Sequence, residues 1–243
     1  MRRVSLIAVL ALLGALLAVG SQEKPGAPAT SADARPTTPH LVWLPAEAAD
    51  LAPLARAARR AGAGAYALSR EADGAPDSWA VCTPIPVYVD RVGAPGGFAG
   101  TVRSAIATLH AATGYRFRFA GTITRGADPR DVVPPSAVTI AWTSAARMPQ
   151  LAGPVVGVTG RMSVNGQILM ARVALDRTLL DLPAATRGRQ VHAVLLHELG
   201  HAMGLEHVTD PRELMYPTVH GQAGFAAGDL AGLKRVGLPR RCA

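Results

Sequence analysis

Three histidines, two glutamates and two glycines lie within the eleven residues HELGHAMGLEH, which begin at His197. If this stretch starts as a helix, His197 and His201 lie one turn apart on the same face, so that two imidazoles point to a single ion. Glu198 then lies at the rim of the same site, where it can accept a proton without being a ligand. Gly204 allows the chain to leave the helix with a positive φ, and His207 can return to the metal from outside the helix.

Three neutral imidazoles and one water make the open tetrahedral site of a catalytic zinc ion, which lowers the pKa of its water to about 7. We therefore expect one Zn²⁺, held by His197, His201 and His207. The spacing matches the metzincin signature, which also requires a methionine turn, and ELMYP supplies Met215 downstream of the third histidine. We expect Met215 to be the apolar floor beneath the zinc rather than an ordinary core methionine.

Composition excludes several other classes of protein. The chain has 243 residues, of which 49% are hydrophobic, enough for one sizeable folded domain. Its formal charge of +8 is not accompanied by a basic cluster with interleaved aromatics, and only 5% of the residues are aromatic, so we expect no nucleic-acid partner. No Ser-His-Asp spacing or glycine-rich phosphate loop competes with the zinc site.

The first twenty residues have the pattern of a secretory signal peptide. Two arginines follow Met1, an apolar run extends over residues 4–19, and Gly20 and Ser21 form a small-residue exit. The alternative is an uncleaved anchor, but the run is shorter than the roughly 20 residues that span a bilayer. We expect a secreted, extracellular protein with no stable membrane association after cleavage of residues 1–20.

The chain has two cysteines, Cys82 and Cys242. An exported chain with an even number of cysteines most simply pairs them, so we expect a disulfide between these two residues. The alternative is two free buried thiols, which export disfavours.

The chain is expected to have four parts. After residues 1–20 comes a Pro/Ala/Thr-rich linker over 21–40, whose composition cannot bury a core. Residues 41–76 carry a short helical pattern and are a pro-segment, a docking arm or a helical spacer. Residues 77–243 are the catalytic domain.

Periodicity within the last part predicts a mixed α/β sheet covered by helices. The expected strands are IPVYVD (85–90), YRFRFAG (115–121), AVTIAW (137–142), GPVVGVTG (153–160) and ILMARVALD (168–176), and the expected helices are 98–114, 186–203 and 228–236.

The stretch HELGHAMGLEHVTDPRELMYPTV resembles the matrixin branch of the metzincins over its whole length, including the Asp210-Pro211 and Tyr216-Pro217 pairs. The resemblance extends more loosely over residues 79–238. It implies an α+β, zincin-like catalytic domain, in which a twisted, mixed five-stranded sheet lies above the active-site helix and a C-terminal helix follows. It also implies that GPVVGVTG is the edge strand which pairs with an extended substrate. Pro217 to Val219 would line the pocket on the primed side.

The chain also departs from animal matrixins. Val208 stands where they usually have serine and Val219 where they usually have tyrosine, so their specificity does not carry over. The loop that holds their structural zinc and calcium is missing, and we expect no second metal. No cysteine lies between Ser21 and Trp79 to act as a latency switch.

Together these features predict a secreted zinc metalloendopeptidase of a bacterial type, with polypeptide substrates and Glu198 as the general base that takes the proton of a zinc-activated water. Two alternatives stay open: a zinc-stabilised extracellular binding module without turnover, and a zinc hydrolase of a non-peptide amide. The sequence gives no indication of oligomeric state.

Overall fold

The computed structural model describes residues 40–45, 66–69, 76–80, 82–124, 135–218 and 221–237. The expected signal peptide, nearly all of the linker, and both Val219 and Cys242 lie outside these residues. No helix in the described ranges is long and apolar enough to cross a membrane.

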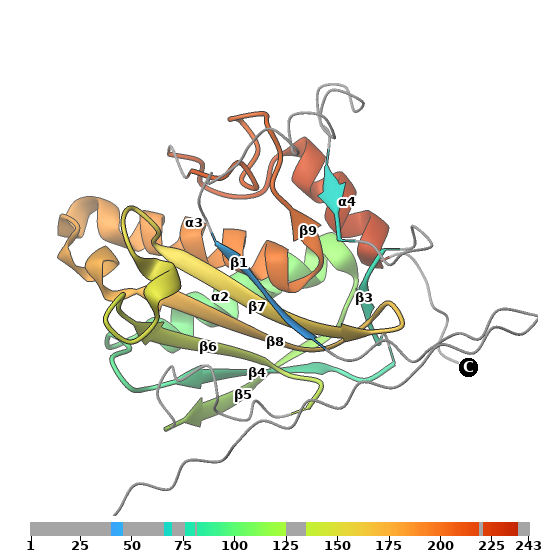
Figure 1. The fold of residues 1–243 in the computed structure, drawn as a ribbon, viewed down its shortest axis with the longest axis horizontal. Coiled ribbons are helices and arrows are strands. Elements are labelled where there is room, and N and C mark those ends of the chain that lie inside the picture. The colour runs from blue at the N-terminus through green and yellow to red at the C-terminus, as the bar shows by residue number, and fades with distance from the viewer. Residues whose placement is uncertain are drawn as a thin grey trace, which may run out of the picture. The chain divides into compact units, whose positions relative to one another are not determined.

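The larger sheet has seven strands in the order β1-β7-β8-β6-β4-β5, and β3 pairs with β8 beside this path (Figure 1). β7 runs antiparallel to β8 and to β1, whereas the pairs β8-β6, β6-β4, β4-β5 and β3-β8 are parallel. The strands are β1 (His40–Pro45), β3 (Ser78–Trp79), β4 (Ile85–Asp90), β5 (Phe117–Ile123), β6 (Val138–Thr143), β7 (Gly157–Val164) and β8 (Gln167–Asp176).

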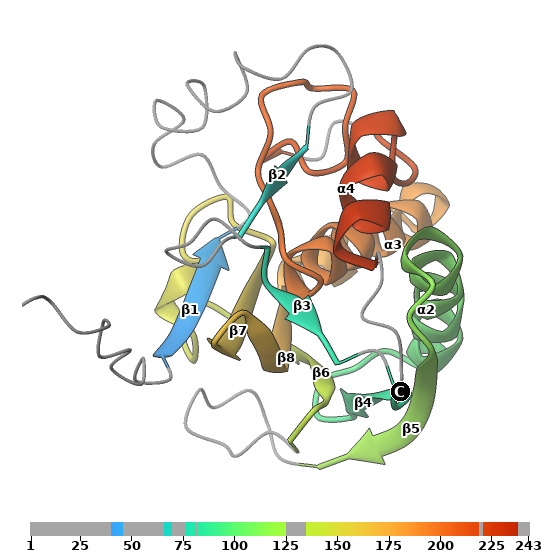
Figure 2. The same cartoon turned by 90° about the vertical axis from the view of Figure 1, so that its right-hand side faces the viewer.

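Three helices lie on one side of this sheet (Figure 2): α2 (Phe98–Thr113), α3 (Ala184–Ala202) and α4 (Ala227–Gly237). In α2 the buried side chains Val102, Ile106 and Leu109 recur at helical spacing, so one face packs into the core. The helix ends at Gly114, which has a φ of +75° and donates its N–H to the carbonyl of His110. Short 3-10 helices follow β6 and β8, at Pro149–Leu151 and Arg177–Asp181.

The α+β fold class is confirmed, and each expected strand corresponds to one of the strands β4 to β8. Two features differ from the expectation. β1 and β3 enlarge the sheet to seven strands, and β7, which was expected at the edge, has β1 outside it. The expectation of an open edge was wrong because β1 pairs with β7 from His40 opposite Ser163 to Pro45 opposite Val158.

A second, two-stranded sheet joins β2 (Ala67–Leu68) to β9 (Leu205–Glu206). A segment ahead of β3 therefore contacts the segment that follows α3. One further hydrogen bond reinforces this contact: Ser69 N donates to Gly204 O at 2.9 Å. Close by, the indole Nε1 of Trp79 in β3 donates to the carbonyl of Ala202 at the end of α3, at 2.8 Å.

Candidate metal centre

The buried half of α3 brings two of the three histidines together. Every residue from Ala193 to Ala202 is buried, because this part of the helix lies between the sheet and the loops that follow it. His197 and His201 are 1% and 0% exposed, and their ring centroids lie 4.8 Å apart. The spacing of one helical turn thus gives two neighbouring imidazoles on one face.

The third histidine reaches the same point from outside the helix. α3 ends at Ala202, and Gly204 turns the chain with a φ of +102°, a conformation that favours glycine. Nε2 of His207 then lies 3.2 Å from Nε2 of His197 and 3.1 Å from Nε2 of His201. These three side chains are the group of potential metal ligands found among the described residues.

Backbone carbonyls hold the imidazoles of His197 and His201 at Nδ1, the ring nitrogen that faces away from the site. Nδ1 of His197 donates to Leu214 O at 2.7 Å, and Nδ1 of His201 donates to Leu205 O at 2.9 Å. Since these Nδ1 atoms carry the ring hydrogen, the Nε2 atoms of both rings are left with lone pairs that point into the site. Contacts of this kind orient the histidine ligands of metal sites.

The histidines are held in the neutral form that binds a metal. Burial lowers the pKa of His197 to about 4, against a smaller opposing effect of the Leu214 carbonyl. Burial, and then the charge of His197, lowers the pKa of His207 to about 3. The pKa of His201 is lowered well below its usual value, chiefly by burial and then by its two histidine neighbours.

The geometry fits a zinc ion. Zn–N bonds of about 2.0–2.1 Å in a tetrahedron place ligand nitrogens about 3.3 Å apart, close to the two spacings found here. Nε2 of His197 and Nε2 of His201 are both acceptors, and Nε2 of His207 can donate its single hydrogen to only one of them. A cation between the rings satisfies all three lone pairs, which hydrogen bonding among the rings does not.

Glu198 follows the first histidine and is 0% exposed. Its Oε2 accepts a 2.6 Å hydrogen bond from the hydroxyl of Thr159 on β7. Its Oε1 is buried and has no hydrogen-bond partner within the described part of the chain. Burial raises the pKa of Glu198 to about 8, and the hydrogen bond from Thr159 opposes that rise.

A cavity of about 210 Å³ opens beside Glu198 and His197. Its wall is mostly apolar, and the residues that line it are Pro154, Val156, Leu179, Leu182, Gln190, Val194, His197, Glu198, Pro217 and Thr218. The structure thus places Pro217 in the cavity wall, while Val219 falls outside the described residues. An unpaired carboxylate oxygen, an imidazole and an apolar pocket meet at one place.

The loop around Met215, the expected methionine turn, packs against the same half of α3. Met215 is 1% exposed, and a Cβ added at Gly200 would lie 2.5 Å from its sulfur, so the side chain rests directly against the helix between the two histidines. Two buried carboxylates hold the turn. Asp229 accepts the N–H groups of Leu214 and Met215, while the carboxylate of Glu213 accepts those of Gly228 and Asp229.

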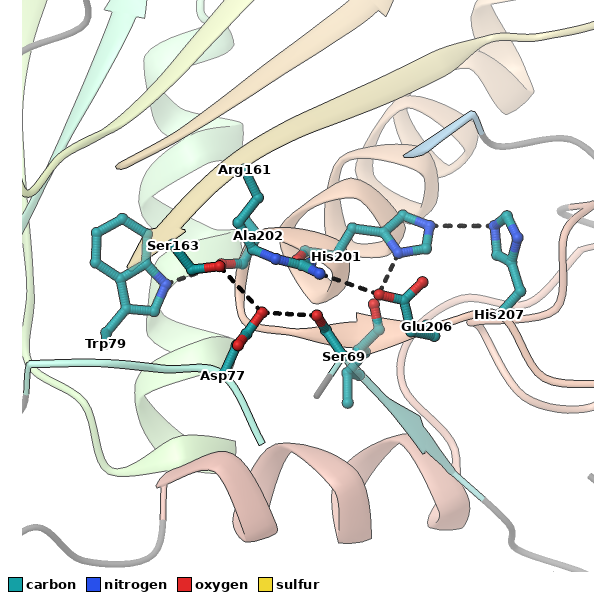
Figure 3. Close-up of polar contacts among 10 residues, drawn as sticks. Ser69, Asp77, Trp79, Arg161, Ser163, His201, Ala202, Glu206 and His207 are labelled. Carbon is teal, nitrogen blue, oxygen red and sulfur yellow. Dashed lines mark hydrogen bonds and ion pairs between the residues drawn. The ribbon is translucent and has the colours of Figure 1, made fainter. Parts of the chain in front are cut away.

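A polar network extends from β7 to the segment that carries His207 (Figure 3). Arg161, 3% exposed, donates to the carbonyl of His201 and forms a 3.0 Å ion pair with Glu206. Beyond it, Asp77 accepts hydrogen bonds from Ser69 at 2.7 Å and Ser163 at 3.3 Å.

Sequence reasoning missed five residues that hold the candidate ligands, the candidate base and the loop around Met215 in place: Thr159, Arg161, Glu206, Glu213 and Asp229. The strand pattern of β7 offered only a weak signal, because two polar residues alternate there with apolar ones and such polar residues usually face solvent. For Asp229 a signal existed, since an acidic residue in the first turn of α4 favours a helix start.

Comparison with known proteins agrees with the geometry. A sequence model of the family described as Matrixin matches residues 113–236, just over half of the chain. Human matrix metalloproteinase-20 is 58% identical to this chain over 60 residues, which are 23% of this chain and 12% of the human protein. The chain thus spans only a small part of the length of that relative.

Proposed function

The chain belongs to the matrixin family of zinc metalloendopeptidases, and we propose that it hydrolyses peptide bonds at a single zinc ion held by His197, His201 and His207, with Glu198 as the general base. The observation that carries the proposal is the convergence of three buried imidazole nitrogens beside an unpaired glutamate oxygen in an apolar pocket. A structural zinc site would close its fourth position with another protein ligand and would need no base.

The chain's own residues supply orientation and proton transfer. Zinc, when bound, supplies a Lewis acid that lowers the pKa of water and polarises a carbonyl group. Thr159 holds Oε2 of Glu198, so Oε1 is left to accept a proton and later to deliver it to the leaving amine. A divalent cation between the histidines favours the ionised carboxylate that a base requires, against the effect of burial.

We propose that substrate adds to β7 as an extended strand and takes the place of β1. The resemblance to matrixins implied substrate pairing along this strand, and β1 already makes an antiparallel ladder with residues 158–163. The ladder ends at Val158, next to Gly157, whose Cα faces the carboxylate of Glu198. A peptide on this edge would therefore run beside the proposed base, with one side chain in the cavity of about 210 Å³.

The remaining expectations stay part of the proposal. We propose export through residues 1–20, a linker over 21–40, a pro-segment or arm over 41–76, and a disulfide between Cys82 and Cys242. We also propose that Met215 forms the apolar floor beneath the zinc ion and that Pro217 and Val219 line the pocket on the primed side.

Digestion of an unfolded protein by the zinc-loaded chain, with mass spectrometry of the products, tests the reaction class. New amino termini within the substrate, absent when zinc is removed by a chelator, are expected. Zinc-loaded protein that generates no new termini, even after removal of residues 1–65, would contradict the peptidase and favour the binding module or the non-peptide hydrolase.

A further inference from the structure

Arg161 joins the strand proposed to bind substrate to one proposed zinc ligand, His201, and to Glu206, the neighbour of another. Its side chain leaves β7 toward α3 and is buried between the end of that helix and β9 (Figure 3). One end of the guanidinium donates to the carbonyl of His201, and the other donates to Oε1 of Glu206 at 3.0 Å. Glu206 immediately precedes His207, so one guanidinium links the main chain at His201 to the side chain of the residue before His207.

His207 depends on its main chain more than the other two histidines do. The carbonyls of Leu214 and Leu205 fix the Nδ1 atoms of His197 and His201. For Nδ1 of His207, the described residues provide no such hydrogen bond. Its ring position therefore follows from the main chain around it, which Arg161 anchors through Glu206 and which β2 anchors by pairing Ala67 with Glu206.

Stability alone does not account for a buried cation at this place. Replacing a buried ion pair by apolar side chains of similar volume is often neutral or stabilising, because desolvation of the charges offsets their attraction. The guanidinium differs from an apolar side chain in its planar, forked set of donors, which holds two acceptors at a fixed separation. Here the two acceptors belong to the segments on either side of the Gly204 turn.

We propose that Arg161 is a positioning residue for the metal centre: by holding His201 O and Glu206 together, it fixes His207 against the two helical histidines and slows the loss of zinc. The proposal rests on the zinc site of the proposed function. It does not depend on which bond the enzyme cleaves.

The test is the rate at which zinc passes from the full chain to an excess of a chelator. In Arg161→Met the apolar length of the side chain is kept and the donors are lost, while Glu206, 25% exposed, stays accessible to water. We expect zinc release to be about 10–100-fold faster, because losing an outer contact of a metal ligand lowers metal affinity by about that factor and a weaker site releases its ion sooner. Release at the wild-type rate from folded Arg161→Met protein overturns the proposal.

Arg172→Met is the matched control. Arg172 is 4% exposed on neighbouring β8, and it alternates with Ala171 and Val173, which belong to the core that includes α3. This variant is expected to lose stability but to release zinc within about twofold of the wild-type rate, since outer contacts act on the ligands they touch. Equal acceleration in both arginine variants overturns the proposal, because a general loosening of the fold would then explain the effect.

Glu206→Gln keeps the test decisive if Arg161→Met does not fold. It removes the charge from the same pair at a partly exposed position and should speed zinc release several-fold, whereas unchanged release contradicts the role of the pair. Chain that binds one zinc ion but cuts no peptide would overturn the proposed peptidase activity alone, so the two failures are distinguishable.

Discussion

The hydroxyl of Thr159 donates a 2.6 Å hydrogen bond to Oε2 of Glu198 and lies 2.9 Å from the carbonyl oxygen of the same residue. Thr159 is on β7 and Glu198 is on α3, so this contact ties the position of the proposed base to the strand proposed to bind substrate. Oε1 is left unpaired within the described residues, beside the cavity.

Thr159→Val should lower kcat by about 10–100-fold with little change in KM, because a hydrogen bond to a charged group contributes about 1.5–3 kcal/mol. Steady-state kinetics on a peptide substrate measure both constants. Thr159→Ser keeps the hydroxyl and should retain most of the activity. Thr139→Val is the matched control, since Thr139 is also buried in the sheet but its hydroxyl has no partner among the described residues. A kcat that is equal in Thr159→Val and Thr139→Val would contradict the role of Thr159.

Gly157→Ala should reduce turnover through a steric effect on the same carboxylate. A Cβ at this position would lie 2.6 Å from Oε1 of Glu198, well inside contact distance, so the base must move. We expect a clear loss of kcat with zinc content unchanged, as measured by metal analysis and kinetics on the same sample. Gly100→Ala serves as the control because a Cβ there meets nothing within 4 Å. Full activity in Gly157→Ala would show that the carboxylate does not need its present position.

Deletion of residues 40–45 should raise kcat/KM on long peptides, mainly through a lower KM. β1 occupies the edge of β7 along which the substrate is proposed to add, so its removal leaves those main-chain groups free. Deletion of residues 26–31, a segment of equal length within the expected linker, is the control. If deleting 40–45 left KM unchanged or raised it while the protein stayed folded, competition between β1 and substrate would be ruled out.

The pH dependence of unfolding should reveal the buried carboxyl of Glu198 in the metal-free protein. Its pKa is raised from 4.5 to about 8 by burial, so the folded state binds a proton that the unfolded state releases, and this group lowers stability as pH rises from about 4.5 to 8. Glu198→Gln lacks this titration. The stability of the variant relative to wild type should therefore increase with pH up to about 8, as measured by urea unfolding with a chelator present. A difference that does not vary with pH would contradict the raised pKa.

Local sequence patterns were enough to predict the elements that carry the three histidines. The spacing of His197 and His201 follows from helix geometry, and Gly204 marks the helix exit, so neither needs information from distant residues. The strands β4 to β8 were predictable for the same reason, since runs such as IPVYVD are rich in β-branched and aromatic residues.

Contacts between distant segments could not be predicted in this way. Thr159 and Arg161 alternate with the apolar Val158 on β7, a pattern that favours an exposed polar face, yet both are buried against α3. Apolar residues of the 3-10 helix at Pro149–Leu151 and the adjoining loop cover the opposite face, where Val158 packs on Leu151 and its neighbours. The pairing of β1 with β7 joins residues more than a hundred positions apart, and no local pattern specifies such a partner.

The most direct test of the central claim compares peptide cleavage by the wild-type chain with that by Glu198→Gln, each shown by metal analysis to hold one zinc ion. Glutamine keeps the shape of the side chain and an acceptor for Thr159 but cannot take up the proton. The account predicts cleavage by the wild type and a loss of at least about 100-fold in kcat for the variant, within the usual range for general-base catalysis. Equal cleavage by both zinc-loaded proteins would contradict the assignment of Glu198 as the base of a zinc peptidase.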